Sequence, residues 1–588
     1  FVISGYLITL LLVSEFERTG QISLRHFWVR RARRLLPALF ALLVVVGVVS
    51  VIFLPDEVGR MRGDLVAAFF YCTNWYLIAT QSSYFDQLGR PPLLRHLWSL
   101  AVEEQFYLVW PVVFYGLLKV FGRNVNRIAT VLLIGAGASV ALMVVWYDPE
   151  KDPSRVYYGT DTRASALLLG ATLALFWRPR ALARGAVRHV GPLFDLVGLV
   201  GLIGIVITGL TIADRDALLY RGGFVLVSVS TLLAIAAVTH PGSILGRYVL
   251  GNPVFVWIGK RSYGLYLWHW PIFDLTRPGI DLQRFELAWW QVQVLRFTAT
   301  VVLTELSFRL LEEPIRGGAL GRWFRSLRGP ATSVVFARRR FTFAVAGLVA
   351  LLVVPAGVVI GTRHPQPTDI EQSLRAGQAV VRTIPIESVS SVQTTTTPAT
   401  AVPDPAVSTP VTPPATVPTT AAPPPASGVP VIAVGDSVML GAAPALANLF
   451  GTNVEVNAKV GRQFKEATDI VNWYHDNGYL GKVVVIHLGN NGTVDDSRID
   501  ELMAPLAGVP LVIFLNDKVP RGWEGPNNDL FTANVPRFAN ALLVDWKTYS
   551  EPNPGWFYSD NIHLRPDGQV AYAALIAQVI HDNGITIP

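Results

Sequence analysis

The chain has 588 residues, of which 51% are hydrophobic and only 15% are charged, and it carries a net charge of +7. A soluble protein carries about 25% charged residues, so the composition excludes a chain that is soluble throughout. Cys72 is the one cysteine of the sequence, which excludes a disulfide within it and a cysteine metal site. The positive charge is concentrated in arginine clusters, a pattern typical of cytoplasmic loops rather than of a nucleic-acid surface.

Apolar segments that suit a membrane-spanning helix follow one another through the first 360 residues. They lie near 1–13, 36–54, 65–80, 97–119, 127–147, 164–177, 192–212, 221–239, 253–275, 287–311 and 341–360. Several reach the roughly 20 residues that a helix needs to cross the hydrocarbon layer, whereas 65–80 and 164–177 are short. The sequence begins inside an apolar segment, at Phe1, so we expect an earlier part of the protein to be missing from it.

Arginine-rich stretches predict the orientation of these helices. Six arginines lie within 18–34, and seven lie within 316–340 with no acidic residue among them. Both stretches are expected to face the cytoplasm. Nine apolar segments lie between them, whereas two loops on one side need an even number of crossings, so we expect 65–80 or 164–177 to be re-entrant. The run 341–360 then takes the chain to the outer side.

The stretch from about Val381 to Ser427 consists mainly of Pro, Thr, Ala, Val and Ser, and a stretch of this composition cannot bury a core. Proline-rich chain extends by about 3.1 Å per residue, which gives this stretch a reach on the order of 100 Å or more. It is either a tether that lets the following domain reach a wall polymer at variable distance or a passive spacer.

Short apolar runs alternate with helix-like segments after Gly428. The runs are 429–434, 454–456, 482–488, 510–515 and 541–545. This alternation predicts a parallel sheet with helices on both faces, in one α/β domain of about 160 residues. The predicted fold class is therefore a polytopic α-helical membrane domain followed by a C-terminal α/β domain.

Two motifs of the predicted α/β domain suggest a nucleophilic serine. Gly435-Asp436-Ser437 directly follows the first predicted strand, and α/β sheets bind ligands at the carboxyl ends of their strands. Near the C-terminus, His563 stands three residues after Asp560. A histidine in this position can take a proton from a serine while the carboxylate orients its ring.

Two further motifs follow predicted strands. The stretch 488–492, Leu-Gly-Asn-Asn-Gly, offers an amide side chain and a glycine N–H, both of which can stabilise an oxyanion. Gly461 follows the second predicted strand. Together these groups predict an oxyanion-binding site beside the serine.

In this order, the four motifs resemble those of the SGNH (GDSL-like) hydrolase family. They are Gly-Asp-Ser-x-x-Leu over 435–440, Gly461, Gly489-x-Asn491 and Asp560-x-x-His563. The resemblance implies that Ser437 is the nucleophile, His563 the base and Asp560 its partner. It also implies an oxyanion hole formed by Gly461, Asn491 and the backbone N–H of Ser437. The alternative is an inactive domain that only binds.

Six motifs of the membrane half resemble the acyltransferase-3 family. They are 1–9 (Phe-Val-Ile-Ser-Gly-Tyr-Leu-Ile-Thr), 30–37 (Arg-Arg-Ala-Arg-Arg-Leu-Leu-Pro), 96–107 (His-Leu-Trp-Ser-Leu-Ala-Val-Glu-Glu-Gln-Phe-Tyr), 160–163 (Thr-Asp-Thr-Arg), 262–269 (Ser-Tyr-Gly-Leu-Tyr-Leu-Trp-His) and 312–316 (Glu-Glu-Pro-Ile-Arg). With the SGNH-like domain, the chain is similar to bacterial O-antigen and cell-wall polysaccharide O-acetyltransferases. The resemblance implies a catalytic arginine and histidine on a first transmembrane helix, which we expect to precede Phe1.

The candidate site residues of the membrane half are ionisable or lie in these motifs. Ionisable groups inside a membrane are costly and by default mark a functional site. Arg30 and Arg34 are expected on the cytoplasmic side, where guanidinium groups suit the phosphates of a CoA donor. The alternatives are an orientation signal for the arginine cluster, hydrogen bonds between helices for the histidines, and packing or helix-end placement for the glutamates. The candidates are Arg30, Arg34, His96, Glu103, Glu104, Arg163, Ser262, Tyr263 and His269.

Four domain ranges follow from these patterns. They are an acyltransferase-3 membrane domain over 1–316, a basic cytoplasmic loop and final transmembrane helix over 317–361, an extracytoplasmic linker over 362–428 and an SGNH domain over 429–588. The chain is expected to be a multi-pass protein of the plasma (inner) membrane, with the SGNH domain on the outer side.

The expected activity is O-acyl transfer. The membrane half would take an acyl group, expected to be acetyl, from cytoplasmic acyl-CoA and pass it to Ser437, which transfers it to a hydroxyl of a cell-envelope glycan. The expected partners are acyl-CoA, the glycan and the lipid bilayer, with no nucleic acid, no metal and no bound cofactor. One alternative is a tethered SGNH esterase that deacylates glycans, and another is a non-catalytic membrane scaffold or transporter.

Overall fold

A computed structural model describes residues 1–55, 57–83, 90–149, 151–179, 190–214, 216–277, 281–282, 285, 287–327, 333–363, 369–381, 428–558 and 560–587. The chain forms two compact units, Phe1–Gln366 and Pro367–Pro588. The Pro- and Thr-rich stretch that is predicted to be a tether lies outside the described residues from residue 382 to residue 427.

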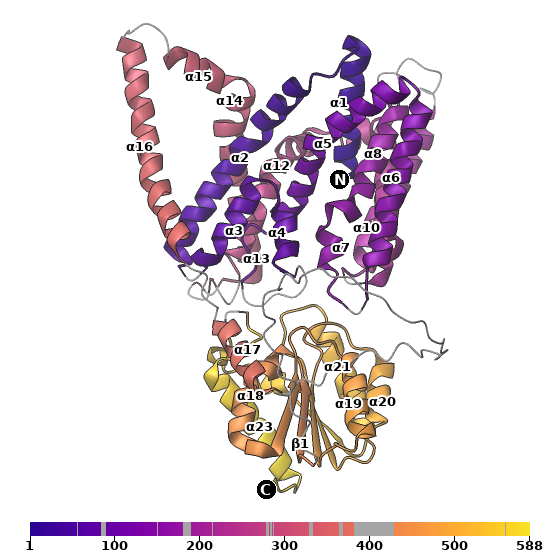
Figure 1. The fold of residues 1–588 in the computed structure, drawn as a ribbon, viewed down its shortest axis with the longest axis vertical. Coiled ribbons are helices and arrows are strands. Elements are labelled where there is room, and N and C mark those ends of the chain that lie inside the picture. Colours follow the sequence, from indigo (N-terminus) through magenta and orange to yellow (C-terminus); the bar gives the residue numbers. More distant parts are fainter. Residues whose placement is uncertain are drawn as a thin grey trace, which may run out of the picture. The chain divides into compact units, whose positions relative to one another are not determined.

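The first unit is helical throughout its described part, coloured from indigo to pink in Figure 1. Among the described residues, four helices are long and apolar enough to cross a membrane: α2, α6, α10 and Leu219–Val238. The helices are α1 Val2–Thr19, α2 Leu24–Phe53, α3 Val58–Phe69, α4 Thr73–Ala79, α5 Leu97–Phe121, α6 Val125–Trp146, α7 Ser154–Tyr158, α8 Thr160–Phe176, α10 Gly191–Thr211, α11 Phe224–Val238, α12 Pro253–Asp274, α13 Trp289–Ser307, α14 Glu313–Arg316, α15 Ala319–Leu327 and α16 Ser333–Thr362, with short π-helical turns η2 Leu219–Gly223, η3 Leu245–Val249 and η5 Phe308–Glu312.

Polar side chains mark the starts of two of these helices. At α6, Asn124 Oδ1 accepts a hydrogen bond from the backbone N–H of Arg127 at 3.1 Å. At α12, Asn252 Oδ1 accepts the N–H groups of Val254 and Phe255. Such caps satisfy N–H groups that have no partner within the helix, and so they fix where each helix begins.

Glycines let α1 and α8 cross at close range. A Cβ atom on Gly5 would lie 1.9 Å from the carbonyl oxygen of Leu167, and one on Gly170 would lie 2.0 Å from that of Val2. A larger residue at either position would push the two backbones apart. The crossing fixes the first turns of α1, which carry Ser4.

The apolar segment 65–80 is split between two short helices. α3 ends at Phe69, α4 begins at Thr73, and Tyr71 between them has a φ of +53°. Figure 1 shows α3 and α4 in the half of the unit where α2 ends. The other short segment, 164–177, belongs to the continuous helix α8. Of the two segments that we expect to be re-entrant, the structure therefore favours 65–80.

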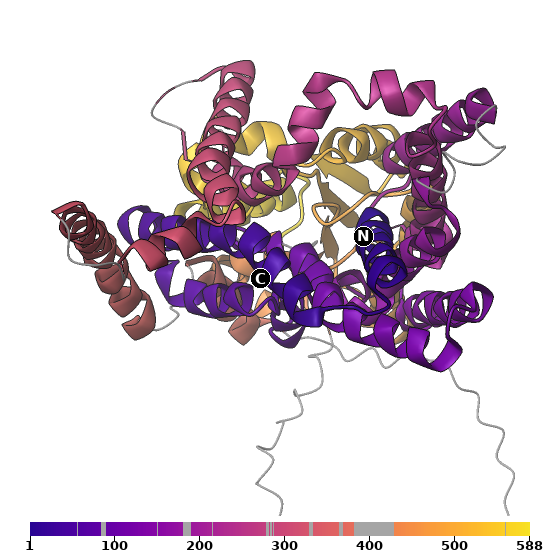
Figure 2. The ribbon, with the colours of Figure 1, turned by 90° about the horizontal axis from the view of Figure 1, so that it is seen from above.

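The last helix of the first unit, α16, contains the apolar run predicted over 341–360 and lies at the edge of the unit (Figure 2). Its Ala356 and Ile360 are buried. A Cβ atom placed on Gly47 of α2 would lie 3.6 Å from Ile360 Cδ1, which is ordinary van der Waals contact. One face of α16 therefore packs on α2.

The second unit contains a parallel five-stranded sheet with the order β2-β1-β3-β4-β5. Each predicted apolar run overlaps one strand, which confirms the predicted α/β fold of this region. Gly435 at the end of β1 is opposite Ala458 of β2 and His487 of β3, so these three strands end at one edge. The strands are β1 Val431–Gly435, β2 Val454–Ala458, β3 Val483–His487, β4 Leu511–Leu515 and β5 Ala541–Val544.

Helices cover both faces of this sheet (Figure 1). β1, β3 and β4 are buried along their whole length, as expected for parallel strands between two helical layers. The core on one side joins Val434 and Phe514 of the sheet to Ile470 and Phe531 of the helices. The helices are α18 Ser437–Phe450 and α23 Pro566–Asp582 on one face, α19 Glu466–Asp476, α20 Asp496–Met503 and α21 Glu524–Asn534 on the other, and the short α22 Trp546–Ser550, with 3-10 turns η6 Gly451–Asn453, η7 Val535–Arg537 and η8 Pro554–Trp556.

One helix of the second unit lies inside the stretch predicted as a linker, 362–428. This helix, α17 (Asp369–Val380), lies beside α18 in Figure 1 and contacts it. Its Ile370 and Leu374 are buried. The compact unit thus begins at Pro367 and not at the predicted boundary of 429, because α18 covers the apolar side of α17.

Candidate active site

The candidate nucleophile, Ser437, is the first residue of α18 and follows β1 after a single residue. That residue, Asp436, caps the helix, because its Oδ1 accepts the N–H of Val438 at 2.9 Å. Its Oδ2 accepts a hydrogen bond from Asn490 Nδ2 at 3.0 Å. Both carboxylate oxygens of Asp436 are thus used to hold the turn that presents Ser437 at the carboxyl edge of the sheet.

Ser437, His563 and Asp560 form one hydrogen-bonded chain. His563 Nε2 lies 2.8 Å from Ser437 Oγ, and His563 Nδ1 lies 2.6 Å from Asp560 Oδ2. Asp560 Oδ1 accepts the backbone N–H groups of Ile562 and His563, each at 3.0 Å. The turn between the acid and the base is tight, since Asn561 takes a φ of +59°.

The environment of Asp560 favours its ionised form. Burial by itself raises the pKa of this carboxyl, but the hydrogen bond and charge of His563 and the two backbone N–H groups outweigh it, so the pKa lies below the ordinary value. An ionised Asp560 holds a proton on His563 Nδ1 and leaves Nε2 to accept the proton of Ser437. The arrangement can therefore activate a serine for attack on an acyl group.

The two candidate oxyanion loops are bound to each other. Asn491 Nδ2 donates to the carbonyl oxygen of Arg462 at 3.2 Å. Gln463 Nε2 lies 3.0 Å from the carbonyl oxygen of Asn491 and 3.2 Å from that of Gly461. Gly461 has a φ of +73°, a backbone conformation that glycine adopts without strain. The loops that follow β2 and β3 thus form one structure that carries both Gly461 and Asn491.

Arg462, which the sequence motifs do not single out, joins this structure to the nucleophile turn. Its Nη1 donates to the carbonyl oxygen of Gly435 at 3.1 Å, and its Nη2 donates to Asn457 Oδ1 at 2.8 Å. The side chain is buried, and burial lowers the pKa of its guanidinium. The sequence motifs do not identify this arginine, because it links the ends of β1 and β2 only once the fold has buried it between them.

A second buried amide fixes the loop after β3. Asn527 Nδ2 donates to the carbonyl oxygen of Gly492 at 2.9 Å and to Asp517 Oδ2 at 2.8 Å. Asn527 Oδ1 accepts the N–H of Val494 at 3.0 Å. Burial raises the pKa of Asp517 well above its ordinary value, and its Oδ1 has no hydrogen-bond partner among the described residues. The sequence offers no signal for this contact beyond two ordinary polar residues.

The first unit contains a cavity of about 400 Å³ that joins five of the candidates from the membrane half. Four helices contribute to it: α1, α2, α5 and α12. The candidates that line it are Arg34, Glu103, Glu104, Ser262 and Tyr263, and the other polar or charged residues are Ser4, Arg31, Ser99, Tyr107 and Tyr266.

The charged groups of this cavity lie around Tyr107. The Tyr107 hydroxyl lies 2.8 Å from Ser4 Oγ and 3.0 Å from Glu103 Oε2. The Arg31 guanidinium lies 4.8 Å from the centre of the Tyr107 ring. Glu104 Oε1 is buried and has no hydrogen-bond partner among the described residues. The cavity thus offers cationic groups from α2 and carboxylates from α5 within one space.

Two of the candidate arginines do not line the cavity. Arg30 is exposed, with 62% of its side chain accessible, and its Nη2 lies 3.3 Å from Glu15 Oε2. Arg163 packs among aromatic rings, 3.9 Å from the ring centre of Phe224 and 5.7 Å from that of Trp98. The guanidinium of Arg163 therefore makes cation–π contacts with these rings.

The two candidate histidines lie next to each other and outside the cavity lining. The ring centres of His96 and His269 are 5.7 Å apart. His96 Nε2 lies 3.2 Å from the carbonyl oxygen of Leu267, and His269 Nδ1 lies 2.6 Å from that of Tyr266. His96 thus hydrogen-bonds to the backbone of α12, in line with the alternative of a hydrogen bond between helices, whereas His269 bonds within its own helix α12.

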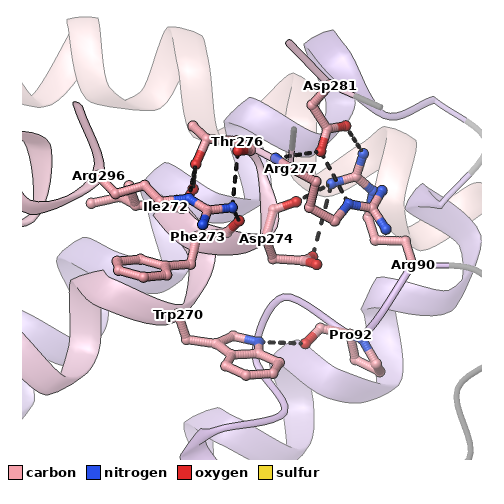
Figure 3. Close-up of polar contacts among 10 residues, drawn as sticks. All are labelled: Arg90, Pro92, Trp270, Ile272, Phe273, Asp274, Thr276, Arg277, Asp281 and Arg296. Carbon is pink, nitrogen blue, oxygen red and sulfur yellow. Dashed lines mark hydrogen bonds and ion pairs between the residues drawn. The ribbon is translucent and has the colours of Figure 1, made fainter. Parts of the chain in front are cut away.

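Arginines fasten the end of α12, as Figure 3 shows. Arg90 Nη1 donates to the carbonyl oxygen of Asp274 at 2.6 Å, and its Nη2 forms an ion pair with Asp281. Asp281 also pairs with Arg277 Nε at 3.1 Å. Arg296 donates to two carbonyl oxygens of the same turn. The network fixes the helix that carries Ser262, Tyr263 and Tyr266 into the cavity.

Comparison with known proteins gives the family of the chain. Residues 1–306 match the family described as "Acyltransferase domain" (Acyl_transf_3). The peptidoglycan O-acetyltransferase OatA of Listeria monocytogenes serovar 1/2a is 33% identical over 611 residues, which cover 99% of this chain and 92% of that protein. The O-acetyltransferase OatA of Staphylococcus aureus (strain NCTC 8325 / PS 47) is 34% identical over 591 residues, 99% of this chain and 90% of that protein.

Among solved structures, the chain is similar to the C-terminal catalytic domain of Streptococcus pneumoniae peptidoglycan O-acetyltransferase A (OatA) with a methylsulfonyl adduct. The match covers 27% of this chain and 96% of that chain, at 21% identity and a TM-score of 0.25. The predicted resemblance to the acyltransferase-3 family and to O-acetyltransferases is confirmed. With its apolar helices, the chain is a membrane protein. It belongs to the acyltransferase family that this domain defines, and it is an acyltransferase.

Proposed function

We propose that this acyltransferase moves an acetyl group from cytoplasmic acetyl-CoA across the membrane to Ser437, which passes it to a hydroxyl of cell-wall peptidoglycan. The observation that carries the proposal is the complete chain of hydrogen bonds from Ser437 through His563 to Asp560. The relatives that match along almost the whole chain are O-acetyltransferases, and one is named for peptidoglycan.

In the first half-reaction, Ser437 becomes acetylated. His563 Nε2 takes the proton of the Ser437 hydroxyl as Oγ attacks the carbonyl carbon of the donor. The carbonyl oxygen becomes an oxyanion, for which Gly461, Asn491 and the backbone N–H of Ser437 are the proposed donors. When the intermediate collapses, the bond to the donor group breaks and His563 returns the proton to that group.

In the second half-reaction, a glycan hydroxyl replaces the donor. His563 takes the proton of this hydroxyl, and its oxygen attacks the acetyl carbonyl carbon. The bond between the acetyl group and Ser437 Oγ then breaks, and the proton passes from His563 to Oγ. The same oxyanion donors serve both intermediates, and Asp560 stabilises the imidazolium that forms in each.

For the membrane step, the cavity of the first unit supports a binding role. Arg31 and Arg34 line it from α2 and belong to the arginine-rich stretch 18–34, which is predicted to be cytoplasmic. Guanidinium groups bind phosphates well, so this end of the cavity suits the phosphates of acetyl-CoA. Glu103 and Glu104 line the cavity from α5. Their carboxyl groups can donate or accept a proton while the thioester of the donor reacts.

The test is the O-acetyl content of peptidoglycan in a deletion strain. The strain is complemented with the full-length parent gene or with its Ser437→Ala variant, and the acetate that mild base releases is measured. We expect the parent gene to restore the ester and Ser437→Ala not to restore it. If the deletion strain instead gains ester and the parent gene removes it, the chain is an esterase and the proposal is wrong.

A further inference from the structure

α17 lies in the stretch expected to be a linker, yet it packs as closely as a core helix on the rest of the second unit, Pro367–Pro588, which we call the catalytic unit; the first unit is the membrane unit. Ile370 and Leu374 are 3% and 4% exposed. A Cβ atom on Gly377 would lie 1.9 Å from the carbonyl oxygen of Leu440 in α18. The backbones of α17 and α18 therefore touch at Gly377, and any side chain at that position would separate them.

The same helix also contacts the segment that carries the base. Gln569 Nε2 of α23 donates to Ser373 Oγ at 2.8 Å and to the carbonyl oxygen of Leu564 at 2.9 Å. Leu564 follows His563 directly in the sequence. α17 is thus connected to the helix that begins with the nucleophile and to the turn that carries the base.

Connectivity gives this contact a mechanical consequence. α16 ends at Thr362 and α17 begins at Asp369, so only residues 363–368 join the membrane unit to the catalytic unit. A link of this length spans at most about 25 Å when fully extended. The Pro- and Thr-rich residues 382–427 start after α17 and end before β1, so both of their ends belong to the catalytic unit.

We propose that α17 is a positioning element: while it is bound to α18 and α23, the covalent link between the two units is limited to residues 363–368, whose extended length is at most about 25 Å. Residues 382–427 do not belong to this link, so their length does not change it. The inference rests on the proposed function, since it concerns how Ser437 is kept within reach of the acetyl group that the membrane unit supplies.

Two insertions in the full-length protein test this proposal. A flexible segment of about 20 residues is placed between Arg363 and Asp369, or, as the matched control, within residues 382–427. Effective concentration falls roughly as the −3/2 power of link length, so the first insertion is expected to lower peptidoglycan acetylation about nine-fold. The control insertion is expected to leave acetylation within about two-fold of the parent, because it does not lengthen the link to the membrane.

A second readout separates positioning from damage to the catalytic unit. The readout is hydrolysis of a soluble acetyl ester by the detergent-purified full-length variants, a reaction that we expect Ser437 to carry out without the membrane unit. Both insertion variants should keep the parent rate. Equal losses of acetylation from both insertions, or no loss from the first, would overturn the proposal. If Ser437→Ala retains acetylation, the proposed function fails, whatever the insertions do.

A disulfide across the α17–α18 contact tests whether the helix stays bound during turnover. A Cβ on Gly441 of α18 would lie 3.4 Å from Ser373 Oγ, so Ser373→Cys with Gly441→Cys can form a bond in a Cys72→Ser background. The oxidised protein is expected to transfer acetyl groups at the rate of its reduced form. A loss on oxidation that a reductant reverses would show that α17 must detach, which contradicts the proposal.

A variant with a larger side chain at the α17–α18 contact tests the opposite case, in which α17 is detached. Gly377→Leu should detach α17 and lower acetylation, whereas Ala379→Leu, on an exposed position of the same helix, should not. If Gly377→Leu keeps full acetylation, binding of α17 does not position the catalytic unit and the proposal is wrong.

Discussion

The two candidate sites of this chain differ in how many of their polar groups have hydrogen-bond partners within the protein. In the catalytic unit, both ring nitrogens of His563 and both carboxylate oxygens of Asp560 have partners within 3.0 Å. In the membrane unit, charged residues of α2 and α5 line a cavity of about 400 Å³, and Glu104 Oε1 is buried with no hydrogen-bond partner among the described residues. The triad is thus an unbroken chain of hydrogen bonds along which a proton can move. The charged groups of the cavity instead line a space that can hold a ligand.

This difference follows from how each site is built. Asp560 and His563 are three residues apart in one turn, so local backbone geometry brings them together. The cavity takes its groups from helices that are distant in sequence, and their spacing depends on helix packing. We therefore expect changes in the triad to abolish the chemistry of the catalytic unit, and changes in the cavity to affect only the supply of acetyl groups.

The largest expected effect comes from breaking the triad. His563→Ala should lower hydrolysis of a soluble acetyl ester by about 10³-fold or more, because Ser437 loses its base. Adding Ser437→Ala should cost little more, since the two residues act as a unit. His581→Ala, at an exposed position of α23, is the matched control. A residual rate near that of the parent would mean that another group serves as the base.

The next test compares two neighbouring amides. Asn491→Ala should lower kcat for the soluble ester by about 10²-fold, as for loss of an oxyanion donor, and should cost less stability than the Asn490 variant because its bond to Arg462 is only partly buried. Asn490→Ala removes a buried hydrogen bond to Asp436 and should instead cost stability, about 1–3 kcal/mol. If Asn490 controls kcat and Asn491 does not, the oxyanion donor is assigned to the wrong residue of the motif.

A third variant tests the cavity by itself. Glu104→Gln should reduce peptidoglycan acetylation in cells at least about ten-fold, the loss expected when a contact of about 1.5–3 kcal/mol to a charged group is removed. Hydrolysis of the soluble ester by the purified protein should not change. Glu17→Gln, which lies outside the cavity lining, should leave both rates as they are. Equal losses in both assays would mean that the two sites do not work separately.

The smallest expected effect concerns Asp517 and pH. Burial raises the pKa of Asp517, so the folded protein keeps this carboxyl neutral where the unfolded chain, with a pKa of about 3.9, is ionised. Stability from this group is therefore full below about pH 4 and is lost as the pH rises. Asn at this position does not titrate.

The stability of Asp517→Asn relative to the parent should consequently increase from pH 4 towards neutral pH. The temperature of half-inactivation of ester hydrolysis, measured for both proteins across this range, provides the comparison. Curves that stay parallel over the whole range would show that Asp517 does not titrate in the way its burial implies.

Much of the catalytic unit can be predicted from the sequence because its signals are short. Each predicted strand is present, and the spacing of Asp560 and His563 already implies their contact. Arg462 and Asn527 have no such signal, since each is an ordinary polar residue until strand ends surround it. α17 has a weak signal: Ile370, Leu374 and Gly377 lie on one helical face, but the Pro- and Thr-rich stretch beside them suggests a linker instead.

By itself, the sequence determined the division into a membrane part and an α/β part, the order of the strands along the chain and the candidate triad Ser437, His563 and Asp560, because apolar runs and local motifs encode these features. Only the tertiary structure decided which membrane residues share a cavity, that His96, His269 and Arg163 lie outside its lining, and that α17 belongs to the catalytic unit. These outcomes depend on contacts between helices far apart in the chain, and such contacts are set by packing, on which neither periodicity nor motif spacing carries information.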